Sequence, residues 1–542
     1  MSDAYVVSSA LSFSWPDDTP VFTDLTFTVP GGRTGLVAPN GTGKTTLLRL
    51  VAGELRPTAG AVTVRGVLGY LPQHLPFAVD QTVAQVLGVD RAVAALHAIE
   101  AGDAREEHFA AVGDDWDVEE RTHAELDRLG LGELALDRRL GTLSGGQVIS
   151  LGLAAQLLRR PDVLLLDEPT NNLDETARER LTAVLRGWTG CLLVVSHDRA
   201  LLDEMDRIAA LEPDELRWYG GNHTAYEQAV RAEREVAQRQ VRSAEQDLRR
   251  QKRELQQARE RAARRASTAA RNLPDAGLAR IVAGGLKRDA QVSAGRAAET
   301  HAARVGDAQD RLDQAGRAAR QDDRIVIDLP DTTVPAGRTV FHGEGLAAEY
   351  AGRPVFTGVD LIIRGPERIA LTGANGAGKS TLLRLVSGDQ QPAAGAATRV
   401  RGRVAYLSQR LDLLDPARTV AENLAAFAPG LADAERMNLL ARFLFRGDRA
   451  HLPVRVLSGG ELLRATLACV LNAAPAPQLL LLDEPTNNLD LDSVAQLEGA
   501  LGGYRGALLV VSHDPRFLAA LGVDRWLRLA DGTLTGTDAP EE

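Results

Sequence analysis

The sequence predicts an α/β protein in which two tandem copies of one domain are joined by a long, basic α-helical hairpin. Three observations support this fold class. The chain has 542 residues, which is more than one hydrophobic core can hold. The same ordered set of short segments occurs at 25–198 and again at 361–514, which indicates a duplication. Between the copies, residues 231–271 are rich in helix-forming side chains and contain no Gly or Pro.

The composition is that of an ordinary globular protein, with 44% hydrophobic and 25% charged residues. No run approaches the roughly 18 apolar residues that a membrane span needs, and residues 1–15 lack the pattern of a secretory signal. We therefore expect a cytoplasmic protein with no membrane partner. Cys191 and Cys469, the only cysteines, stand in separate apolar runs. They predict buried, reduced thiols and give no support to a disulfide framework.

The charge is distributed unevenly along the chain. The net charge is −11, yet residues 231–296 hold 17 basic and 8 acidic side chains, a local charge of +9. A second helical stretch is expected at 286–320, after interruptions by Gly and Pro at 272–285. Together the stretches predict a hairpin whose first arm extends on the order of 60 Å. Such a rod attracts phosphate backbones; the alternative is a solvated hairpin whose apolar residues only pack its two arms together.

Two glycine-rich loops carry the first chemical signal. Residues 373–380 read GANGAGKS and match the P-loop pattern, in which backbone amides and a helix N-terminus bind phosphates. Residues 38–45 read APNGTGKT and depart from the pattern at Ala38, which replaces the leading glycine. Two of the four lysines in the chain stand in these loops, where a compact ammonium fits between phosphates. Nucleotide binding is predicted for Asn40, Gly41, Gly43, Lys44, Thr45, Thr46, Gly373, Asn375, Gly376, Gly378, Lys379, Ser380 and Thr381.

Each copy also has an apolar strand that ends in Asp-Glu. In such a pair the aspartate steadies Mg²⁺ and the neighbouring carboxylate can orient water. The sequence thus predicts Asp167 and Asp483 as metal-side residues, with Glu168 and Glu484 as the catalytic bases.

One histidine follows 30 residues after each of these aspartates, at the end of another apolar run. A lone histidine is usually structural. Here the equal spacing, and the place at the carboxyl end of a strand, favour His197 and His513 as sensors of a γ-phosphate.

The segments LSGGQ at 143–147 and LSGGE at 457–461 complete the set, and with them the chain resembles the ABC ATPase superfamily over most of its length. The resemblance implies two tandem P-loop ABC nucleotide-binding domains, at 1–222 and 324–542, joined by a helical hairpin linker at 223–323. It implies ATP and Mg²⁺ as cofactors and ATP hydrolysis as the activity. No obligate homodimer is implied, because both domains stand on one chain.

The resemblance further implies two composite sites, each with ATP between the P-loop of one domain and the signature segment of the other. The first site would join Lys44, Thr45, Gln73, Asp167, Glu168 and His197 with Ser458, Gly459 and Gly460. The second would join Lys379, Ser380, Gln409, Asp483, Glu484 and His513 with Ser144, Gly145 and Gly146. The oxygens implied for Mg²⁺ belong to Thr45, Gln73, Asp167, Ser380, Gln409 and Asp483.

Two aromatic residues stand at matching places upstream of the P-loops. Trp15 and Tyr350 resemble the aromatic that stacks on adenine in the family. For either residue alone, a buried core aromatic is an equal expectation.

The segment DEPTNNLD, at 167–174 and again at 483–490, resembles the ABC-F class. Residues 219–226, which lead into the basic linker, resemble that class as well. Asn172 and Asn488 depart from the histidine that many members carry. The class implies binding to the ribosomal E site with ATP, and a linker tip, here about 264–296, near the peptidyl-transferase centre. The partners implied are rRNA and P-site tRNA.

Several functions stay open. The linker length and the absence of a basic arm favour antibiotic resistance by ribosome protection, and the alternative within the class is a housekeeping translation factor. The first copy has 22 extra residues between Gln73 and Ser144, and acidic side chains there predict a variation of the helical subdomain and not an RNA-binding arm. A tandem ATPase subunit of a membrane importer needs no basic hairpin. A DNA-repair or chromosome-organising ATPase is disfavoured by the lack of a very long coiled coil and of zinc cysteines.

Overall fold

The computed structural model describes residues 4–73, 75, 77–171, 173–212, 215–272, 300, 302–316, 325, 329–350, 352–399, 403–487 and 489–539. The chain divides into two compact units, Met1–Tyr226 with Arg324–Glu542, and Glu227–Asp323. The first unit contains both copies of the duplicated segment set. The domain boundaries at 222/223 and 323/324 stay a prediction.

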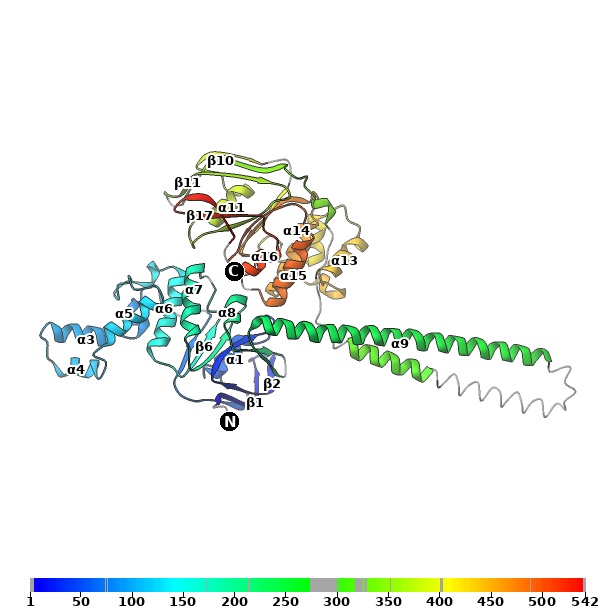
Figure 1. Ribbon diagram of the computed structural model, residues 1–542, viewed down its shortest axis with the longest axis horizontal. Helices are drawn as coiled ribbons and strands as arrows, with labels where there is room; N and C mark the ends of the chain where they lie inside the picture. Colours follow the sequence, from blue (N-terminus) through cyan, green and yellow to red (C-terminus); the bar gives the residue numbers. More distant parts are fainter. Residues whose placement is uncertain are drawn as a thin grey trace. The chain divides into compact units, whose positions relative to one another are not determined.

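The first copy is built on a six-stranded sheet with the order β5-β6-β7-β3-β8-β9. Figure 1 labels its strand β6, with helices α6, α7 and α8 nearby. Neighbouring strands are parallel except for β8 and β9. The strands are β3 (Gly32–Val37), β5 (Leu68–Leu71), β6 (Val163–Asp167), β7 (Cys191–Val195), β8 (Arg207–Leu211) and β9 (Leu216–Gly220). A second, antiparallel sheet contains β1 (Ala4–Ser14), β2 (Pro20–Pro30) and β4 (Ala59–Val64).

The second copy repeats this arrangement, with the order β14-β15-β16-β12-β17-β18 and a three-stranded sheet β11-β10-β13. The strands of its larger sheet are β12 (Arg368–Thr372), β14 (Arg403–Leu407), β15 (Pro477–Asp483), β16 (Ala507–Val511), β17 (Arg525–Ala530) and β18 (Thr533–Thr537). The smaller sheet contains β10 (Thr339–Tyr350), β11 (Arg353–Arg364) and β13 (Ala394–Arg399). Because carboxyl ends of parallel strands share one edge, residues that follow β3, β6 and β7 meet there.

The helices of the first copy follow the strands in alternation, as α/β folds require. They are α1 (Lys44–Val51), α2 (Val83–Leu87), α3 (Asp90–Glu100), α4 (Glu106–Val112), α5 (Val118–Arg128), η1 (Leu140–Thr142), α6 (Gly145–Leu158), α7 (Glu175–Arg186) and α8 (Arg199–Asp203). The extra 22 residues are accommodated by the helical segment that holds α3, α4 and α5, which confirms the expected variation of the helical subdomain.

The described part of the second copy has fewer helices between Gln409 and Ser458 than the first copy has between Gln73 and Ser144. The helices of the second copy are η2 (Pro330–Thr332), α11 (Lys379–Ser387), α12 (Val420–Phe427), α13 (Asp433–Arg442), η3 (Gly447–His451), η4 (Val454–Val456), α14 (Gly459–Leu471), α15 (Leu491–Gly502) and α16 (Pro515–Ala520). None of the helices among the described residues combines the length and the apolarity of a membrane span.

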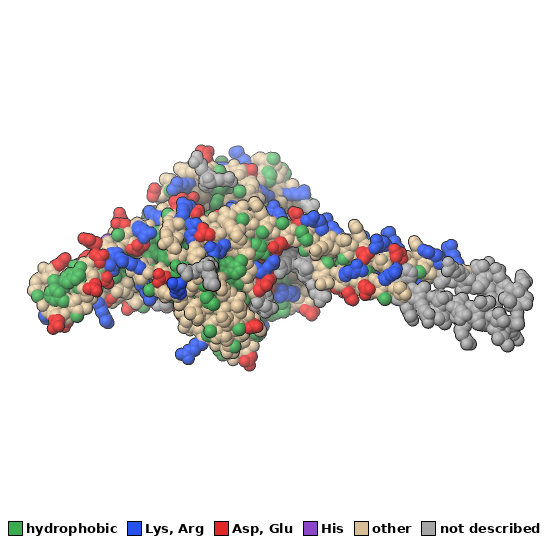
Figure 2. Space-filling view, turned by 60° about the horizontal axis from the view of Figure 1, so that its bottom comes forward, with side chains coloured by type: hydrophobic (Ala, Val, Ile, Leu, Met, Phe, Trp, Pro, Cys, Tyr) green, Lys and Arg blue, Asp and Glu red, His purple; other side chains and the backbone are tan. Residues whose placement is uncertain are grey.

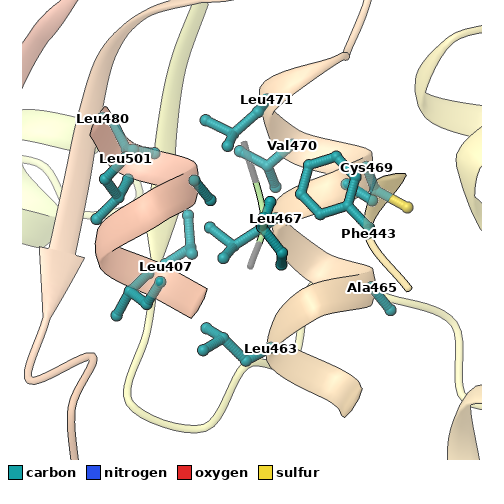
Figure 3. Close-up of a cluster of buried hydrophobic side chains, with 14 of the residues drawn as sticks. Leu407, Phe443, Leu463, Ala465, Leu467, Cys469, Val470, Leu471, Leu480 and Leu501 are labelled. Carbon is teal, nitrogen blue, oxygen red and sulfur yellow. The ribbon is translucent and has the colours of Figure 1, made fainter. Parts of the chain in front are cut away.

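The central strands β6, β7, β15 and β16 of the large sheets are buried on both faces, which explains why they read as continuous apolar runs. In β15, Leu479 and Leu481 belong to one buried cluster, whereas Leu480 and Leu482 belong to another. Figure 3 shows the second of these clusters, in which side chains of α14, among them Leu467, pack with Leu501 of α15 and Leu480 of β15. Cys469 lies in it, and burial raises the pKa of its thiol to about 12.

Both cysteines are free and buried, as the sequence predicted. Burial raises the pKa of Cys191 to about 11, and the nearby Arg207 lowers it only in part. Protonated thiols inside a core are inert, so neither residue is a candidate for metal or redox chemistry.

The second unit consists of helices. Helix α9 (His223–Asn272) is 50 residues long and begins eight residues before the predicted start. A second helix covers 302–316 and packs against it, with Leu248 and Ala308 buried and Arg311 Nη1 3.3 Å from Asp247 Oδ2. Residues 273–299 and 317–324, with most of the predicted linker tip, lie outside the described residues. The helical hairpin therefore stays a prediction.

Candidate nucleotide-binding sites

Each P-loop connects a central strand to a helix. The first leads from β3 into α1, and the second leads from β12 into α11. Gly43 and Gly378 immediately precede these helices with φ angles of 99° and 100°. A Cβ at either position would lie about 2.5 Å from a valine methyl group, 2.6 Å from Val21 and 2.5 Å from Val355. Only glycine fits, and the loop can turn its amides toward an anion at the helix N-terminus.

The P-loop lysines fold back over their own loops. Lys44 Nζ donates to Ala38 O at 2.7 Å and lies 3.3 Å from Asn40 Oδ1. Lys379 Nζ donates to Gly373 O at 2.6 Å and to Ala374 O at 3.1 Å. Burial lowers the pKa of both ammonium groups, while nearby carboxylates oppose that effect. Each site thus holds a buried cation whose donors are directed at oxygens of its own loop, a setting that favours a phosphate ligand.

The carboxylates follow β6 and β15 in an uncommon backbone conformation. Glu168 and Glu484 have φ angles of 51° and 47°, although neither is glycine. Their amides donate to Val195 O at 2.8 Å and to Val511 O at 2.9 Å, and these bonds hold each residue against the next strand. A left-handed residue other than glycine costs free energy and persists where the surrounding structure determines it. The same departure in both copies marks these positions as functional candidates.

Each histidine lies beside the glutamate of its own domain. His197 Nε2 is 3.2 Å from Glu168 Oε1, and His513 Nε2 is 3.1 Å from Glu484 Oε1. Burial raises the pKa of Glu168 to about 8 and that of Glu484 to about 7. It lowers the pKa of His197 to about 3 and that of His513 to about 4. A carboxyl group that titrates near neutrality beside a neutral imidazole can accept a proton from water.

The predicted residues of the first domain meet in one cavity of about 390 Å³, a volume within the range of ligand pockets. Its lining includes Asn40, Gly41, Gly43, Lys44, Thr45, Thr46, Gln73, Asp167, Glu168, Asn171, Val195 and His197. The donor set suits ATP with Mg²⁺, because a hydroxyl, an amide oxygen and one carboxylate are hard oxygen ligands. The second domain also fits such a ligand, because Glu484 Oε2 is buried there without a hydrogen-bond partner among the described residues.

The second domain arranges its counterparts similarly. Lys379 lies near enough to Asp483 and Glu484 for their charges to raise its pKa. Tyr406 Oη donates to Asp483 Oδ2 at 2.8 Å. Gln409 is exposed. The roles of these residues, and those of Asn375, Gly376, Ser380 and Thr381 in the loop, stay predictions.

The signature segments form helix N-termini with complete caps. Ser144 begins α6 and Ser458 begins α14, each with a reciprocal bond to the residue three places later. Within the described part of the chain, the cavity at the first P-loop is lined by residues of its own domain, and the signature residues Ser458, Gly459 and Gly460 do not line it. The composite arrangement of the two sites, including that of Ser144, Gly145 and Gly146, therefore stays a prediction.

The two upstream aromatic residues are exposed. Trp15 is 37% accessible and packs edge-on against Phe13, while Tyr350 is 80% accessible. The expectation that either is a buried core aromatic is wrong, because Trp15 follows β1 and Tyr350 ends β10 at the surface. Adenine stacking stays a prediction for both. Asn172 and Asn488 lie outside the described residues.

The sequence pattern of the ABC transporter family matches residues 22–171 and 356–487. The chain belongs to the ABC family. Tylosin resistance ATP-binding protein TlrC of Streptomyces fradiae is 35% identical over 565 residues, which cover 96% of this chain and 96% of that one. Probable ATP-binding protein YheS of Escherichia coli is 32% identical over 512 residues, which cover 92% of this chain and 74% of that one. Within the family the chain is an ABC-F protein.

The fold is also similar to a solved structure named RNase-L Inhibitor. The TM-score is 0.58 at 19% identity, with 99% of this chain and 91% of that chain covered. This likeness supports the tandem arrangement of two ABC domains. ABC domains are ATPases as a family, and two are present here.

The two ABC domains contact each other at the first P-loop. Asn40 N donates to Asp490 Oδ2 at 2.7 Å, and Asp490 also caps α15 through Ser493 N at 2.8 Å. Arg199, which follows the first domain's histidine segment, pairs with Glu498 at 2.8 Å. The first P-loop is thus held by a carboxylate of the second domain.

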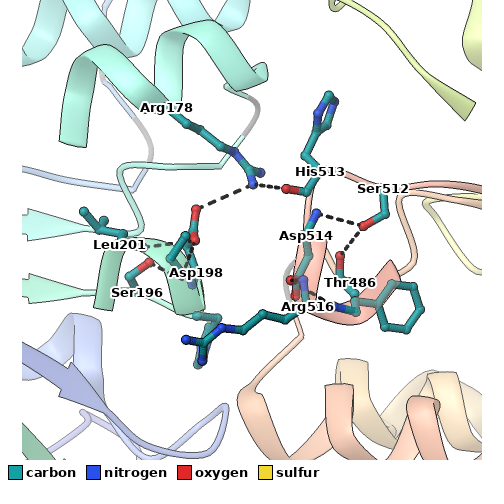
Figure 4. A network of polar contacts seen from close by, with 12 residues as sticks. Arg178, Ser196, Asp198, Leu201, Thr486, Ser512, His513, Asp514 and Arg516 are labelled. Atoms are coloured by element: carbon teal, nitrogen blue, oxygen red, sulfur yellow. Dashed lines mark hydrogen bonds and ion pairs between the residues drawn. The ribbon is translucent and has the colours of Figure 1, made fainter. Parts of the chain in front are cut away.

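Different residues make the corresponding contacts at the second site (Figure 4). Arg178 Nη1 donates to His513 O at 3.3 Å. Arg516 contacts Asp203 and donates to Thr224 Oγ1 at 3.0 Å, in the first turn of α9. The histidine segment of the second domain is therefore bound to the first domain at two points.

Sequence reasoning missed several residues of this neighbourhood. Asp174 and Asp490 end the duplicated DEPTNNLD segment, and Tyr70 and Tyr406 stand three residues before Gln73 and Gln409, so the duplication itself could have indicated them. Arg178 gave no such signal, because its counterpart in the other copy is apolar.

Proposed function

We propose that the chain is an ATP-dependent, ribosome-binding ABC-F protein that confers antibiotic resistance by ribosome protection. The observation that carries this proposal is its 35% identity, over nearly the full length of both chains, to a protein named for tylosin resistance. Two nearly equivalent sets of nucleotide-binding residues support the ATP dependence. We place the protein in the cytoplasm and expect it to act without an obligate homodimer.

At each site the chain's own residues have distinct roles in this proposal. Lys44 and Lys379 bind the β and γ phosphates of ATP, and the loop glycines bring the backbone amides to the same groups. The implied Mg²⁺ neutralises charge on the phosphates when it is bound. Thr45, Gln73 and Asp167 would hold it at the first site, and Ser380, Gln409 and Asp483 would do so at the second.

Glu168 and Glu484 are proposed to accept the proton of the attacking water. Each carboxylate directly follows the proposed metal-side aspartate, a place from which it can orient the attacking water and accept its proton. His197 and His513, neutral at that pH, each lie within 3.2 Å of the glutamate and are proposed to detect the γ-phosphate. Loss of this phosphate would release the contact and open the two domains.

The basic linker is proposed to contact rRNA and P-site tRNA from the E site. Figure 2 shows Lys and Arg side chains spread along the described part of α9, with acidic side chains between them. Arg249 and Arg250 have 73% and 68% of their side-chain area exposed. Exposed cations on a long helix favour phosphate backbones, with an affinity that falls as salt rises. The tip near the peptidyl-transferase centre would then reach the drug-binding region.

A second candidate function is that of a housekeeping translation factor. We keep it because YheS, 32% identical to this chain, is named for probable ATP binding and not for resistance. The two functions differ in whether expression of the protein protects cells and translation from a drug of the tylosin class.

Sedimentation with ribosomes tests ribosome binding. The variant with Glu168→Gln and Glu484→Gln should pellet with 70S ribosomes through a sucrose cushion in ATP and stay in the supernatant without it. A variant with Lys44→Ala and Lys379→Ala is the control for ATP dependence. Absence of binding in both conditions would overturn the proposed ribosome binding. Drug protection of translation in vitro then separates resistance from a housekeeping role.

The linker contact has its own test. Reversing Arg249 and Arg250 to Glu should weaken ribosome association at least about tenfold at physiological salt, because several phosphate contacts are lost. Reversing Arg105 and Arg128, exposed arginines of the helical subdomain, gives the same change in net charge and is the matched control. Equal weakening by both variants would show that the linker is not the contact.

A further inference from the structure

Arg178 lies one turn inside α7, on the side of the first ABC domain that reaches the second ATP site. Its Nη1 donates to the backbone carbonyl of His513 at 3.3 Å, and it lies 3.5 Å from Asp198 Oδ2 (Figure 4). About one fifth of its side chain is exposed. Among the described residues, Arg178 Nε is buried without a hydrogen-bond partner. The guanidinium is therefore held between two histidine segments.

Hydrogen bonds hold the Asp198 side chain in place, and Asp198 in turn restricts the position of Arg178. The Asp198 carboxylate caps α8 by accepting bonds from Ala200 N at 3.0 Å and Leu201 N at 3.2 Å. Asp198 N in turn donates to Ser196 Oγ at 3.0 Å. A capped aspartate adjoining Arg178 restricts the rotamers of the long side chain, so the position of the His513 carbonyl is restricted too.

Among the residues that the structure describes, the first site has no equivalent cation. Helices α7 and α15 begin after the duplicated aspartates Asp174 and Asp490, and the residue of α15 that matches Arg178 is Val494. Val494 is 3% exposed and belongs to the core of the second domain. An uncharged, buried side chain therefore stands where an arginine would be needed to reach the His197 segment.

The charge of Arg178 acts on the two residues of the second site that face ATP. It contributes electrostatically at both Glu484 and His513, beside the larger effect of Lys379. At Glu168 and His197 the cation that contributes is Lys44 alone among the described groups. The second site thus has one more cation than the first, and that cation belongs to the other domain.

We propose that Arg178 is a positioning residue that the first ABC domain supplies to the second ATP site, where it holds the His513 segment in place for hydrolysis. The inference rests on the proposed roles of Glu484 and His513. It makes the two ATP sites unequal in a defined way: hydrolysis at the second depends on a residue of the opposite domain that the first does not have. Its action passes through His513, since its hydrogen bond goes to that residue's carbonyl.

The test uses full-length protein in which one site is silenced at a time. Glu168→Gln leaves only the second site active, and Glu484→Gln leaves only the first. In the Glu168→Gln background, Arg178→Ala should lower kcat about tenfold and change KM less than about twofold. In the Glu484→Gln background the same substitution should change kcat less than about twofold. Arg178→Lys, which keeps a cation and a donor, should restore part of the loss.

Arg186→Ala is the matched control, because Arg186 stands on the same helix and pairs with Glu204 at 2.6 Å. It should leave kcat unchanged in both backgrounds. An equal fall of kcat in both backgrounds on removal of Arg178 would mean that the arginine only holds the domains together, and would overturn the proposal. No fall in the Glu168→Gln background would overturn it as well. Retained hydrolysis in the double Gln variant would instead refute the proposed role of the glutamates.

A second measurement covers the case in which silencing one site stops both. Vanadate trapping of a photoreactive azido-ATP in otherwise unaltered protein, followed by proteolysis between the domains, reports on each half separately. Arg178→Ala should reduce the label in the second half at least about fivefold and spare the first half. Equal labelling of both halves would overturn the proposal.

Discussion

The two ATP sites are built on the same scaffold, yet their P-loops differ at the first residue. Gly373 has a φ of 145°, and a Cβ there would lie 2.3 Å from Leu529 O. Ala38, at the matching place, is not among the residues with positive φ. The first loop therefore begins with a different backbone conformation. The replacement of the leading glycine by Ala38 thus goes with a different local backbone geometry and does not by itself indicate a site that cannot bind ATP.

The surroundings of Asp167 and Asp483, the proposed metal-side aspartates, differ as well. Tyr406 Oη donates to Asp483 Oδ2 at 2.8 Å, whereas the hydroxyl of Tyr70, its counterpart, is buried without a hydrogen-bond partner among the described residues. Burial raises the pKa of Tyr70, and its hydroxyl stays protonated. The comparison teaches that the duplicated sites keep their scaffold and diverge in the side chains around it, above all where the opposite domain approaches.

The largest effect is expected when the proposed general base is removed from both sites at once. Replacing both Glu168 and Glu484 with Gln should lower ATP hydrolysis at least about 100-fold, because the proposed general bases are lost. ATP binding, followed with a fluorescent nucleotide, should persist. Steady-state phosphate release measures the loss. Turnover at the unaltered rate would refute the assignment of both residues.

The next effect concerns the P-loop glycine. Gly373→Ala should destabilise the second domain by about 2–3 kcal/mol, because the new Cβ meets a backbone oxygen at a φ that alanine rarely adopts. Ala38→Gly is the matched change in the first loop and should cost less than about 1 kcal/mol, through backbone entropy alone. Denaturant unfolding of both variants measures the difference. Similar losses would mean that the two loops share one geometry.

A smaller effect is expected at the tyrosines. Tyr406→Phe removes a hydrogen bond to a carboxylate and should destabilise the protein by about 1–2 kcal/mol. Tyr70→Phe removes a buried hydroxyl without a partner and should be neutral or slightly stabilising. Thermal unfolding measured at low and high Mg²⁺ checks both. A loss from Tyr70→Phe as large as that from Tyr406→Phe would contradict the difference seen between the sites.

The smallest effect is expected at Arg516. Arg516→Ala removes its contacts with Asp203 and Thr224, yet the pair is partly exposed, so the stability cost should stay below about 1 kcal/mol. The stimulation of ATP hydrolysis by ribosomes is a more sensitive measurement than stability. In the variant this stimulation should fall, while hydrolysis without ribosomes persists. Equal stimulation in the variant and the unaltered protein would show that this contact carries no signal to α9.

Much of the fold and of the first site follows from the duplicated motifs. The apolar runs predict parallel strands, and residues after β3, β6 and β7 must then share one edge, which places Lys44, Asp167 and His197 in one cavity. Contacts between the domains could not be predicted, because they depend on how two surfaces meet and not on local periodicity. Arg178 makes one of these contacts. The exposure of Tyr350 could not be predicted either, because it depends on where β10 ends and not on the apolar character of the ring.

The continuity of α9 has a mechanical consequence. Its first turn is tied to the second domain through Arg516 and Thr224, and its 50 residues contain neither Gly nor Pro to absorb bending. A helix of that length measures about 75 Å, so a tilt of about 5° at its base displaces its far end by about 6 Å. A displacement of only about 0.5 Å across the anchored turn, which rises about 5.4 Å, therefore moves the far end of the helix by a distance comparable to the size of a nucleotide base.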